Sequence, residues 1–251
     1  MTDHVKKLPG MIRLPETEST SRYLEQLAGA GGDVADETLV VADFQTAGRG
    51  QPGNSWESEA GKNLTFSLLL YPKNLRAGRS FLIAELASLS VRHLLDGYIR
   101  GVTVKWPNDI YWRDRKICGI LIENVLSGKR IVRSIIGIGL NVNQDTFLSD
   151  ASAPVSLKQI TGRSHDRIRL LEEFRAGFHR LRQRLESGAH VDELHREYMS
   201  ALYRREGYFA YRDRNGCFEA RIHHIEPSGH LILARKDGTL SRYTFKEVAC
   251  L

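Results

Sequence analysis

The chain has 251 residues, of which 41% are hydrophobic, and its formal net charge is +6. That length suits one large domain, or one large and one small domain, with a sizeable core. No apolar run is long enough to cross a bilayer, and no apolar segment follows the charged N-terminus, so neither a membrane span nor a secretory signal is expected. The scattered cysteines Cys118, Cys217 and Cys250 argue for a reducing cytoplasm and against a disulfide framework or a zinc site.

The positive charge permits nucleic-acid binding, but it equally suits an enzyme that handles anionic substrates or docks an acidic partner. The densest basic stretch, residues 163–184, is interleaved with glutamates and apolar residues. This pattern favours a solvated helix face with intrahelical ion pairs.

The first part of the chain predicts a strand at 11–14 and a helix at 22–28, with the Ser/Thr cluster before the helix as its N-cap. An apolar run at 38–44 reads as a buried strand, and 63–71 as another. The ranges 80–99, 156–160, 167–185 and 191–203 have helical periodicity or composition, and strands are expected at 102–106, 110–112, 116–125 and 131–140. The pattern predicts an α+β fold: a mixed, mainly antiparallel sheet with helices on one face.

The character of the sequence changes after Gly207. Short strand candidates at 208–211, 217–225, 231–235 and 241–245 are separated by glycine-containing turns. This predicts a small β-barrel-like module, and we divide the chain at 1–204 and 205–251.

A glycine-rich loop, Gly48-Arg49-Gly50-Gln51-Pro52-Gly53-Asn54-Ser55-Trp56, follows the strand predicted at 38–44. Its glycines allow positive φ and close approach to a ligand, Arg49 suits a carboxylate or phosphate, and Trp56 offers a face for stacking. The loop lacks the pattern of a Walker P-loop or of a dinucleotide-binding fingerprint. By itself it is equally consistent with a surface hairpin carrying a solvated arginine.

Three further blocks follow in order: Lys105-Trp106-Pro107-Asn108-Asp109-Ile110, Arg115-Lys116-Ile117-Cys118-Gly119-Ile120-Leu121-Ile122-Glu123 and Gly137-Ile138-Gly139-Leu140-Asn141-Val142-Asn143. Together with the glycine loop they resemble the biotin–protein ligases, from about Ser19 to the C-terminus. The resemblance implies a catalytic domain of that family's class II synthetase-like fold followed by an SH3-like C-terminal domain. It also implies ATP, Mg²⁺ and biotin as ligands, biotinyl-adenylate as intermediate, and a biotin carboxyl carrier domain as protein partner.

The resemblance assigns the reacting groups. Arg49 and Lys116 would contact the biotin carboxylate and the reacting phosphate, and Lys105 is a further basic candidate. Asn108 and Asp109 offer the oxygen ligands that Mg²⁺ prefers, with an Asx turn as the structural alternative. Asp109 is also a candidate acceptor for the proton of the carrier lysine.

The remaining assignments concern the two ends of the ligand. The nucleotide would meet Trp56 over its adenine and Asn141 near the adenine end. The biotin-binding residues implied by the resemblance are Ser19, Thr20, Ser21, Gln45, Arg49, Gly50, Gln51, Lys116 and Gly119. Each polar residue has a bland alternative, such as a helix cap or a solvated turn.

The chain departs from the family at Gln51, where many members have arginine, and the later loop positions Asn54 and Ser55 are also uncharged. We hypothesise that this loop retains the adenylate less tightly. Only ten residues precede the first predicted strand, which leaves no room for the helix-turn-helix domain of the family's repressor members, so no operator binding is expected. A homodimer through an exposed sheet edge is possible.

Three other functions compete with biotin ligation. A lipoate–protein ligase shares the catalytic architecture and an acyl-adenylate. A nucleic-acid-binding regulator is suggested by the charge alone. A non-catalytic biotin-binding or scaffold protein would retain the pocket without ATP-dependent turnover.

Overall fold

The computed structural model describes residues 10–29, 34–51, 53–148, 153–186 and 190–251. Its larger sheet has seven strands in the order β1-β2-β3-β7-β6-β5-β4. They are β1 (Met11–Thr17), β2 (Leu39–Gln45), β3 (Leu64–Leu70), β4 (Val102–Lys105), β5 (Asp109–Trp112), β6 (Arg115–Ser127) and β7 (Arg130–Leu140). Only β1 and β2 pair in parallel, and every other neighbouring pair is antiparallel. The predicted mixed, mainly antiparallel sheet is therefore confirmed.

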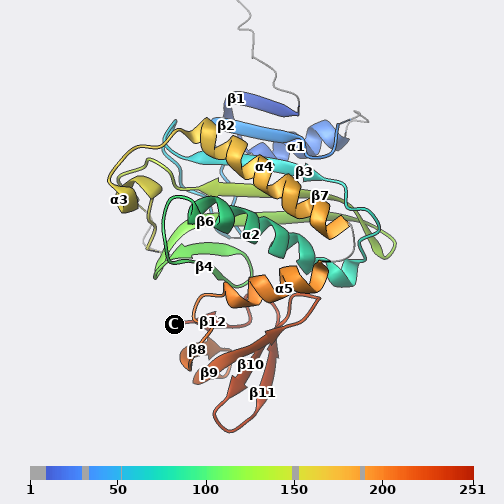
Figure 1. The fold of residues 1–251 in the computed structure, drawn as a ribbon, viewed down its shortest axis with the longest axis vertical. Coiled ribbons are helices and arrows are strands. Elements are labelled where there is room, and N and C mark those ends of the chain that lie inside the picture. Colours follow the sequence, from blue (N-terminus) through green and yellow to red (C-terminus); the bar gives the residue numbers. More distant parts are fainter. Residues whose placement is uncertain (1–9, 30–33, 52, 149–152, 187–189) are drawn as a thin grey trace, which may run out of the picture.

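Helices α2 (Phe81–Asp96) and α4 (Arg167–Glu186) lie across one face of this sheet, and α5 (Val191–Ser200) packs beside α2 (Figure 1). The single-turn η1 (Ala77–Arg79) precedes α2, and the short α3 (Leu157–Thr161) follows β7. Helix α2 is buried along most of its length, as its Ala- and Leu-rich sequence predicts, because the sheet covers one side and α4 and α5 cover the other.

Helix α1 (Thr20–Gly29) packs on the opposite face, against β2, β3 and β7, so the prediction that the helices lie on one face was wrong. Its Leu24 belongs to a small cluster with Val40, Leu69 and Ile135, separate from the main core. Alternate side chains of a strand point to opposite faces, so Leu68 and Leu70 of β3 join the main core while Leu69 meets α1. Strand β3 is consequently buried on both faces, which explains its continuous apolar run.

The C-terminal residues form a second, five-stranded antiparallel sheet in the order β11-β10-β9-β8-β12. Its strands are β8 (Phe209–Asp213), β9 (Gly216–Ile225), β10 (Leu231–Arg235), β11 (Leu240–Tyr243) and β12 (Ala249–Cys250). It lies at the foot of the molecule in Figure 1, below α5 and β4. Trp106 Nε1 donates to the carbonyl of Gly229 at 3.0 Å, so the two sheets meet directly beside the block 105–109.

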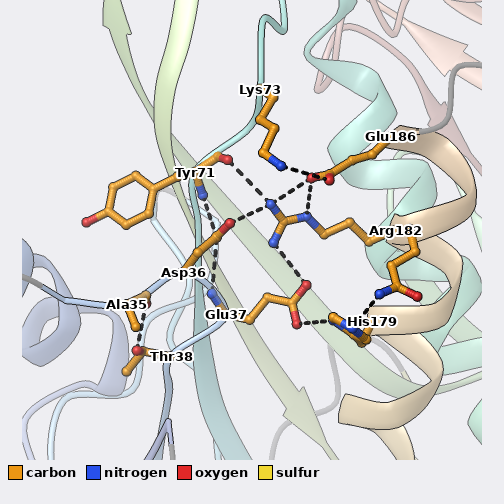
Figure 2. A network of polar contacts seen from close by, with 10 residues as sticks. Ala35, Asp36, Glu37, Thr38, Tyr71, Lys73, His179, Arg182 and Glu186 are labelled. Atoms are coloured by element: carbon orange, nitrogen blue, oxygen red, sulfur yellow. Dashed lines mark hydrogen bonds and ion pairs between the residues drawn. The ribbon is translucent and has the colours of Figure 1, made fainter.

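A buried arginine ties α4 to the loop that leads into β2 (Figure 2). Arg182 donates to Asp36 Oδ2 at 2.5 Å, to Glu37 Oε1 at 2.9 Å and to Glu186 Oε1 at 3.0 Å. Its side chain is 10% exposed. A buried guanidinium has a large desolvation cost unless carboxylates compensate it, so these contacts fix the end of α4 against the sheet.

The described residues contain no helix that is long and apolar enough to cross a membrane.

Candidate functional site

A pocket opens where the start of α1, the end of β2 and the glycine loop meet the face of β3, β6 and β7. It encloses about 500 Å³, open solvent included, and its lining contains most of the residues singled out in the sequence. Those residues are Ser19, Thr20, Ser21, Gln45, Arg49, Gly50, Gln51, Trp56, Asp109, Lys116 and Gly119. Positions separated by as many as 100 residues along the chain thus converge on one cavity.

The closed end of the pocket is a chain of hydrogen bonds from α1 to the sheet. Gln45 Oε1 accepts from the backbone N–H of Thr20 at 2.8 Å and from its hydroxyl at 3.0 Å. The hydroxyl of Ser67 on β3 lies 2.8 Å from that of Thr20 and 2.9 Å from that of Ser21. Gln45 therefore caps the N-terminus of α1 by accepting hydrogen bonds from Thr20. The hydroxyls of Thr20, Ser21 and Ser67 hydrogen-bond to one another, as buried polar groups require.

Ser67 was not predicted from the sequence. It is fully buried and stands in the otherwise apolar run of β3, and a lone hydroxyl in such a run is the signal that could have identified it. Gly137 completes this end of the pocket, because a Cβ there would lie 2.6 Å from Ser21 Oγ.

The floor of the pocket is a flat slot over two glycines. Gly119 of β6 and Gly139 of β7 face each other across the antiparallel pair. The indole of Trp56 lies on them: a Cβ at Gly139 would lie 2.3 Å from Trp56 Cε2, and one at Gly119 would lie 2.8 Å from Trp56 Cζ3. The indole Nε1 is buried, and no described residue accepts its hydrogen bond. The two glycines therefore leave room for a ring system, and the indole of Trp56 occupies that space here.

The glycine loop is a tight hairpin that positions Trp56 over the slot. Trp56 N donates to the carbonyl of Gly48 at 3.0 Å, and Gly50 N donates to that of Asn54 at 3.0 Å. A Cβ at Gly48 would come within 2.6 Å of the Trp56 carbonyl oxygen, so only glycine fits there. Pro52, named in the sequence motif, lies outside the described residues.

Both candidate cations are held by carboxylates. Lys116 Nζ lies 2.6 Å from Asp109 Oδ2, and Arg49 spans Glu123 with contacts of 2.7 and 3.3 Å. A β-bulge between Ile110 and Tyr111 of β5 adjoins Lys116, and such irregularities re-aim side chains. Lys116 and Arg49 are thus positioned beside the slot, each paired with a carboxylate whose place an anionic ligand could take. Glu123 was not predicted as a site residue.

Three predicted residues lie outside this pocket. Asn141 is buried at the end of β7, where its amide donates to the carbonyl of Val155 at 3.2 Å. It lines a second, wider cleft next to the pocket, and this cleft is also lined by the glycine loop, Asp109, Lys116 and residues 245–246. Asn108 is also buried, with no described partner for its Oδ1. Lys105 points elsewhere: its Nζ lies 5.0 Å from the ring centroid of Tyr111, in a cleft against the C-terminal sheet. The structure does not bring Lys105 into the pocket.

Cys118 is buried two residues after Lys116, and burial, followed by the charge of Asp109, raises the pKa of its thiol. A protonated thiol is a poor nucleophile. The described residues also contain no cluster of three or more His, Cys, Asp or Glu side chains arranged to hold a metal ion.

Residues 14–141 match the model of the biotin/lipoate A/B protein ligase family. The chain belongs to this family. All fourteen predicted site residues lie within the matched range, from Ser19 to Asn141. The matched range therefore contains the whole described lining of the pocket, including its glycine slot.

Among curated relatives, the chain is 31% identical over 232 residues to the bifunctional ligase/repressor BirA of Bacillus spizizenii. This match covers 90% of this chain and 70% of the relative. It is 31% identical over 180 residues to a biotin–[acetyl-CoA-carboxylase] ligase of Paracoccus denitrificans, covering 69% of this chain and 73% of the relative.

The fold is similar to that of a biotin protein ligase from Aquifex aeolicus solved in complex with biotin and ATP. The TM-score is 0.78 at 24% identity, and the match covers 97% of this chain and 99% of that chain. This similarity extends beyond the family match through the C-terminal sheet, so the predicted α+β class with a small C-terminal β module is confirmed.

Proposed function

We propose that the protein is an ATP-dependent biotin–protein ligase. It forms biotinyl-5′-adenylate and then transfers biotin to a lysine of a biotin carboxyl carrier domain. The observation that carries this proposal is the convergence, in one pocket, of a paired polar end, a flat glycine-floored slot and two cations. These parts match the ureido ring, the fused-ring body and the carboxylate of biotin.

Biotin enters with its ureido ring at the closed end. A buried ureido group needs acceptors for its N–H groups and donors for its carbonyl. Ser19, Thr20 and Ser21 at the start of α1 supply both kinds of group, together with Gln45 at the end of β2. The ring body lies over Gly119 and Gly139, so the indole of Trp56 leaves that slot and covers the nucleotide from the loop side.

The first step joins two anions. A carboxylate oxygen of biotin forms a bond to the α-phosphorus of ATP, and the bond from that phosphorus to pyrophosphate breaks. Arg49 and Lys116 change partners, from Glu123 and Asp109 to the carboxylate and the reacting phosphate. Placing cations where negative charge accumulates and holding the reactants in attack geometry lower the barrier.

Mg²⁺ fits this site as a companion of the triphosphate. Asp109 is the carboxylate that lines both the pocket and the wider cleft. Mg²⁺ commonly binds one or two carboxylates and otherwise keeps phosphate and water oxygens. The ion would screen the phosphate charges, and Asn108 and Asn141 would shape the nucleotide side of the cleft.

The second step transfers the acyl group. The neutral amine of the carrier lysine attacks the anhydride carbonyl, AMP leaves, and the ammonium proton passes to an acceptor. Asp109 is the nearest described carboxylate to Lys116, at 2.6 Å, and we assign it this role. The net charge of +6 would steer an acidic carrier domain to the site.

The chain divides in this proposal into a catalytic unit, residues 1–204, and an SH3-like unit, residues 205–251. A homodimer through the edge strand β1 is disfavoured, because Pro15 removes a donor and Arg13 and Glu16 place charges on that edge. If the protein dimerises, we expect another surface to be used. Light scattering of the wild type and of an edge variant, Pro15→Val, tests this: dimerisation in Pro15→Val alone would show that Pro15 protects the β1 edge.

The transfer reaction tests the proposal. The protein is incubated with biotin, MgATP and a purified carrier domain, and the modified residue is located by mass spectrometry. We expect biotin on one lysine and stoichiometric AMP. A carrier whose target lysine is replaced by arginine is the control. Modification by lipoate in place of biotin would support the lipoate–protein ligase alternative, and tight biotin binding without AMP release would support a scaffold.

A further inference from the structure

The turn between β11 and β12 forms one wall of the wider cleft. That cleft encloses about 1870 Å³, open solvent included, and the glycine loop also lines it. Phe245 and Lys246 line it together with Gln51, Trp56, Lys116 and Asn141. The C-terminal sheet, which lies outside the matched family range, therefore contributes side chains to the same space as the predicted nucleotide residues.

Lys246 holds a conformation that favours glycine. Its φ is 72°, in the left-handed region. The turn is closed by Glu247 N, which donates to the carbonyl of Thr244 at 3.2 Å, and by Thr244 N, which donates to Glu247 Oε2 at 2.6 Å. Lys246 is the third residue of this four-residue turn, a position where positive φ selects glycine or asparagine. A strained lysine at the rim of a site indicates that the side chain has a use there.

The charges of the cleft indicate which use. Among the described residues that line it, the cations are Lys116 and Lys246, and the acids are Glu57 and Asp109. Lys116 already lies 2.6 Å from Asp109. The loop side presents Gln51, Asn54 and Ser55, none of which carries a charge. A triphosphate brought into this cleft needs more positive charge than the loop provides.

We propose that Lys246, on the turn between β11 and β12, binds the phosphate chain of ATP in this cleft. It thereby replaces, from the C-terminal sheet, the cation that the loop lacks at Gln51. This inference rests on the proposed function, because it assigns a substrate-binding residue to the same reaction. It also gives the C-terminal module a direct part in nucleotide binding.

The test measures nucleotide affinity separately from turnover. An ATP analogue with a methylene bridge between the α- and β-phosphates is titrated calorimetrically with Mg²⁺ into the full-length wild type, K246G, K246A and K246R. K246G removes the charge and relieves the positive-φ strain, whereas K246R keeps the charge. K236A is the matched control, because Lys236 is an exposed lysine of the same sheet, 2.6 Å from Glu219 and outside the cleft.

We expect K246G and K246A to bind the analogue about fivefold more weakly, as for the loss of one partly solvated charge-assisted contact, with biotin affinity unchanged. K246R and K236A keep the wild-type affinity, and circular dichroism checks that K246G and K246A are folded. Wild-type affinity in K246G overturns the inference. A wild type that binds the analogue but never turns over biotin contradicts the ligase function instead, and the ratio between the variants still decides the role of Lys246.

Discussion

Lys116 of β6 and Asp109 of β5 lie with their charged atoms 2.6 Å apart at the junction of the pocket and the wider cleft. The backbone of Lys116 is fixed as well, because its N–H donates to the carbonyl of Ala153 and its carbonyl accepts from Val155. Because the backbone of Lys116 is fixed, only its side chain has to turn from Asp109 to the reacting phosphate.

Replacing Lys116 by alanine should abolish adenylate formation in a folded protein. Loss of a preorganised cation or donor typically lowers kcat by about 10² to 10³. Single-turnover formation of adenylate measures the loss, and circular dichroism checks the fold. Lys158 offers a matched control, because it lies at the same 2.6 Å from Asp145 on the surface. Wild-type activity in K116A, or an equal loss in K158A, would contradict the assignment.

The glycine slot can be filled by a single methyl group. A Cβ at Gly139 would lie 2.3 Å from the Trp56 indole, so G139A obstructs the space that the biotin rings and the indole share in turn. We expect the KM for biotin to rise about tenfold or more, with tryptophan fluorescence altered in the free protein. G177A in α4 is the control: beyond the adjacent backbone of α4 itself, no heavy atom of the described residues lies within 4 Å of the added Cβ, and alanine in a helix stabilises by about 0.5–1 kcal/mol. Unchanged biotin binding in G139A would place the rings elsewhere.

Gln51 lines both the pocket and the cleft on the loop side. Gln51→Arg adds a fixed cation beside the phosphates, so the adenylate should leave the enzyme more slowly. Release of preformed adenylate into a chase of unlabelled biotin and ATP measures this rate. Gln51→Leu, of similar size and without charge, should release it at the wild-type rate or faster. An unchanged release rate in Gln51→Arg would show that the loop charge does not govern retention.

The network around Arg182 should matter for stability and not for chemistry. Removing one partner of a fully buried ion pair costs about 3–5 kcal/mol, and the partial exposure of the carboxylates here reduces this to about 2 kcal/mol for R182A. That corresponds to a fall in Tm of about 4–8 °C. K73A is the control within the same network, because Lys73 is 76% exposed where it meets Glu186. Its loss should change Tm by less than about 2 °C. Equal effects of the two variants would contradict the role given to burial.

The elements of the fold were largely predictable, because their signals are local. Periodicity and turn residues predicted helices α1 to α5 and every strand except the two-residue β12, and the motif blocks predicted most of the pocket lining. The structure adds that α1 packs on the opposite face from α2 and α4. The face on which α1 packs could not be predicted from the sequence, because both faces of β2 and β3 are apolar.

Contacts between distant residues were not predictable from the sequence. Glu123 lies 74 positions from its partner Arg49, and their meeting depends on the register of β6 and on the course of the glycine loop. Lys105 belongs to a recognised block, yet its Nζ lies beside the contacting rings of Tyr111 and Tyr203, 5.0 and 5.9 Å from their centroids. A sequence block shared with a family predicts that the local backbone is shared with it, whereas the direction of a long side chain depends on its neighbours in space.

Pyrophosphate exchange into ATP, run in parallel with biotin and with lipoate, tests the central claim most directly. It reports the adenylation half-reaction and needs no carrier domain. We predict exchange that requires biotin and Mg²⁺ and is absent from K116A. Exchange with lipoate and not with biotin would contradict the claim, and so would no exchange with either acid from a protein that binds biotin.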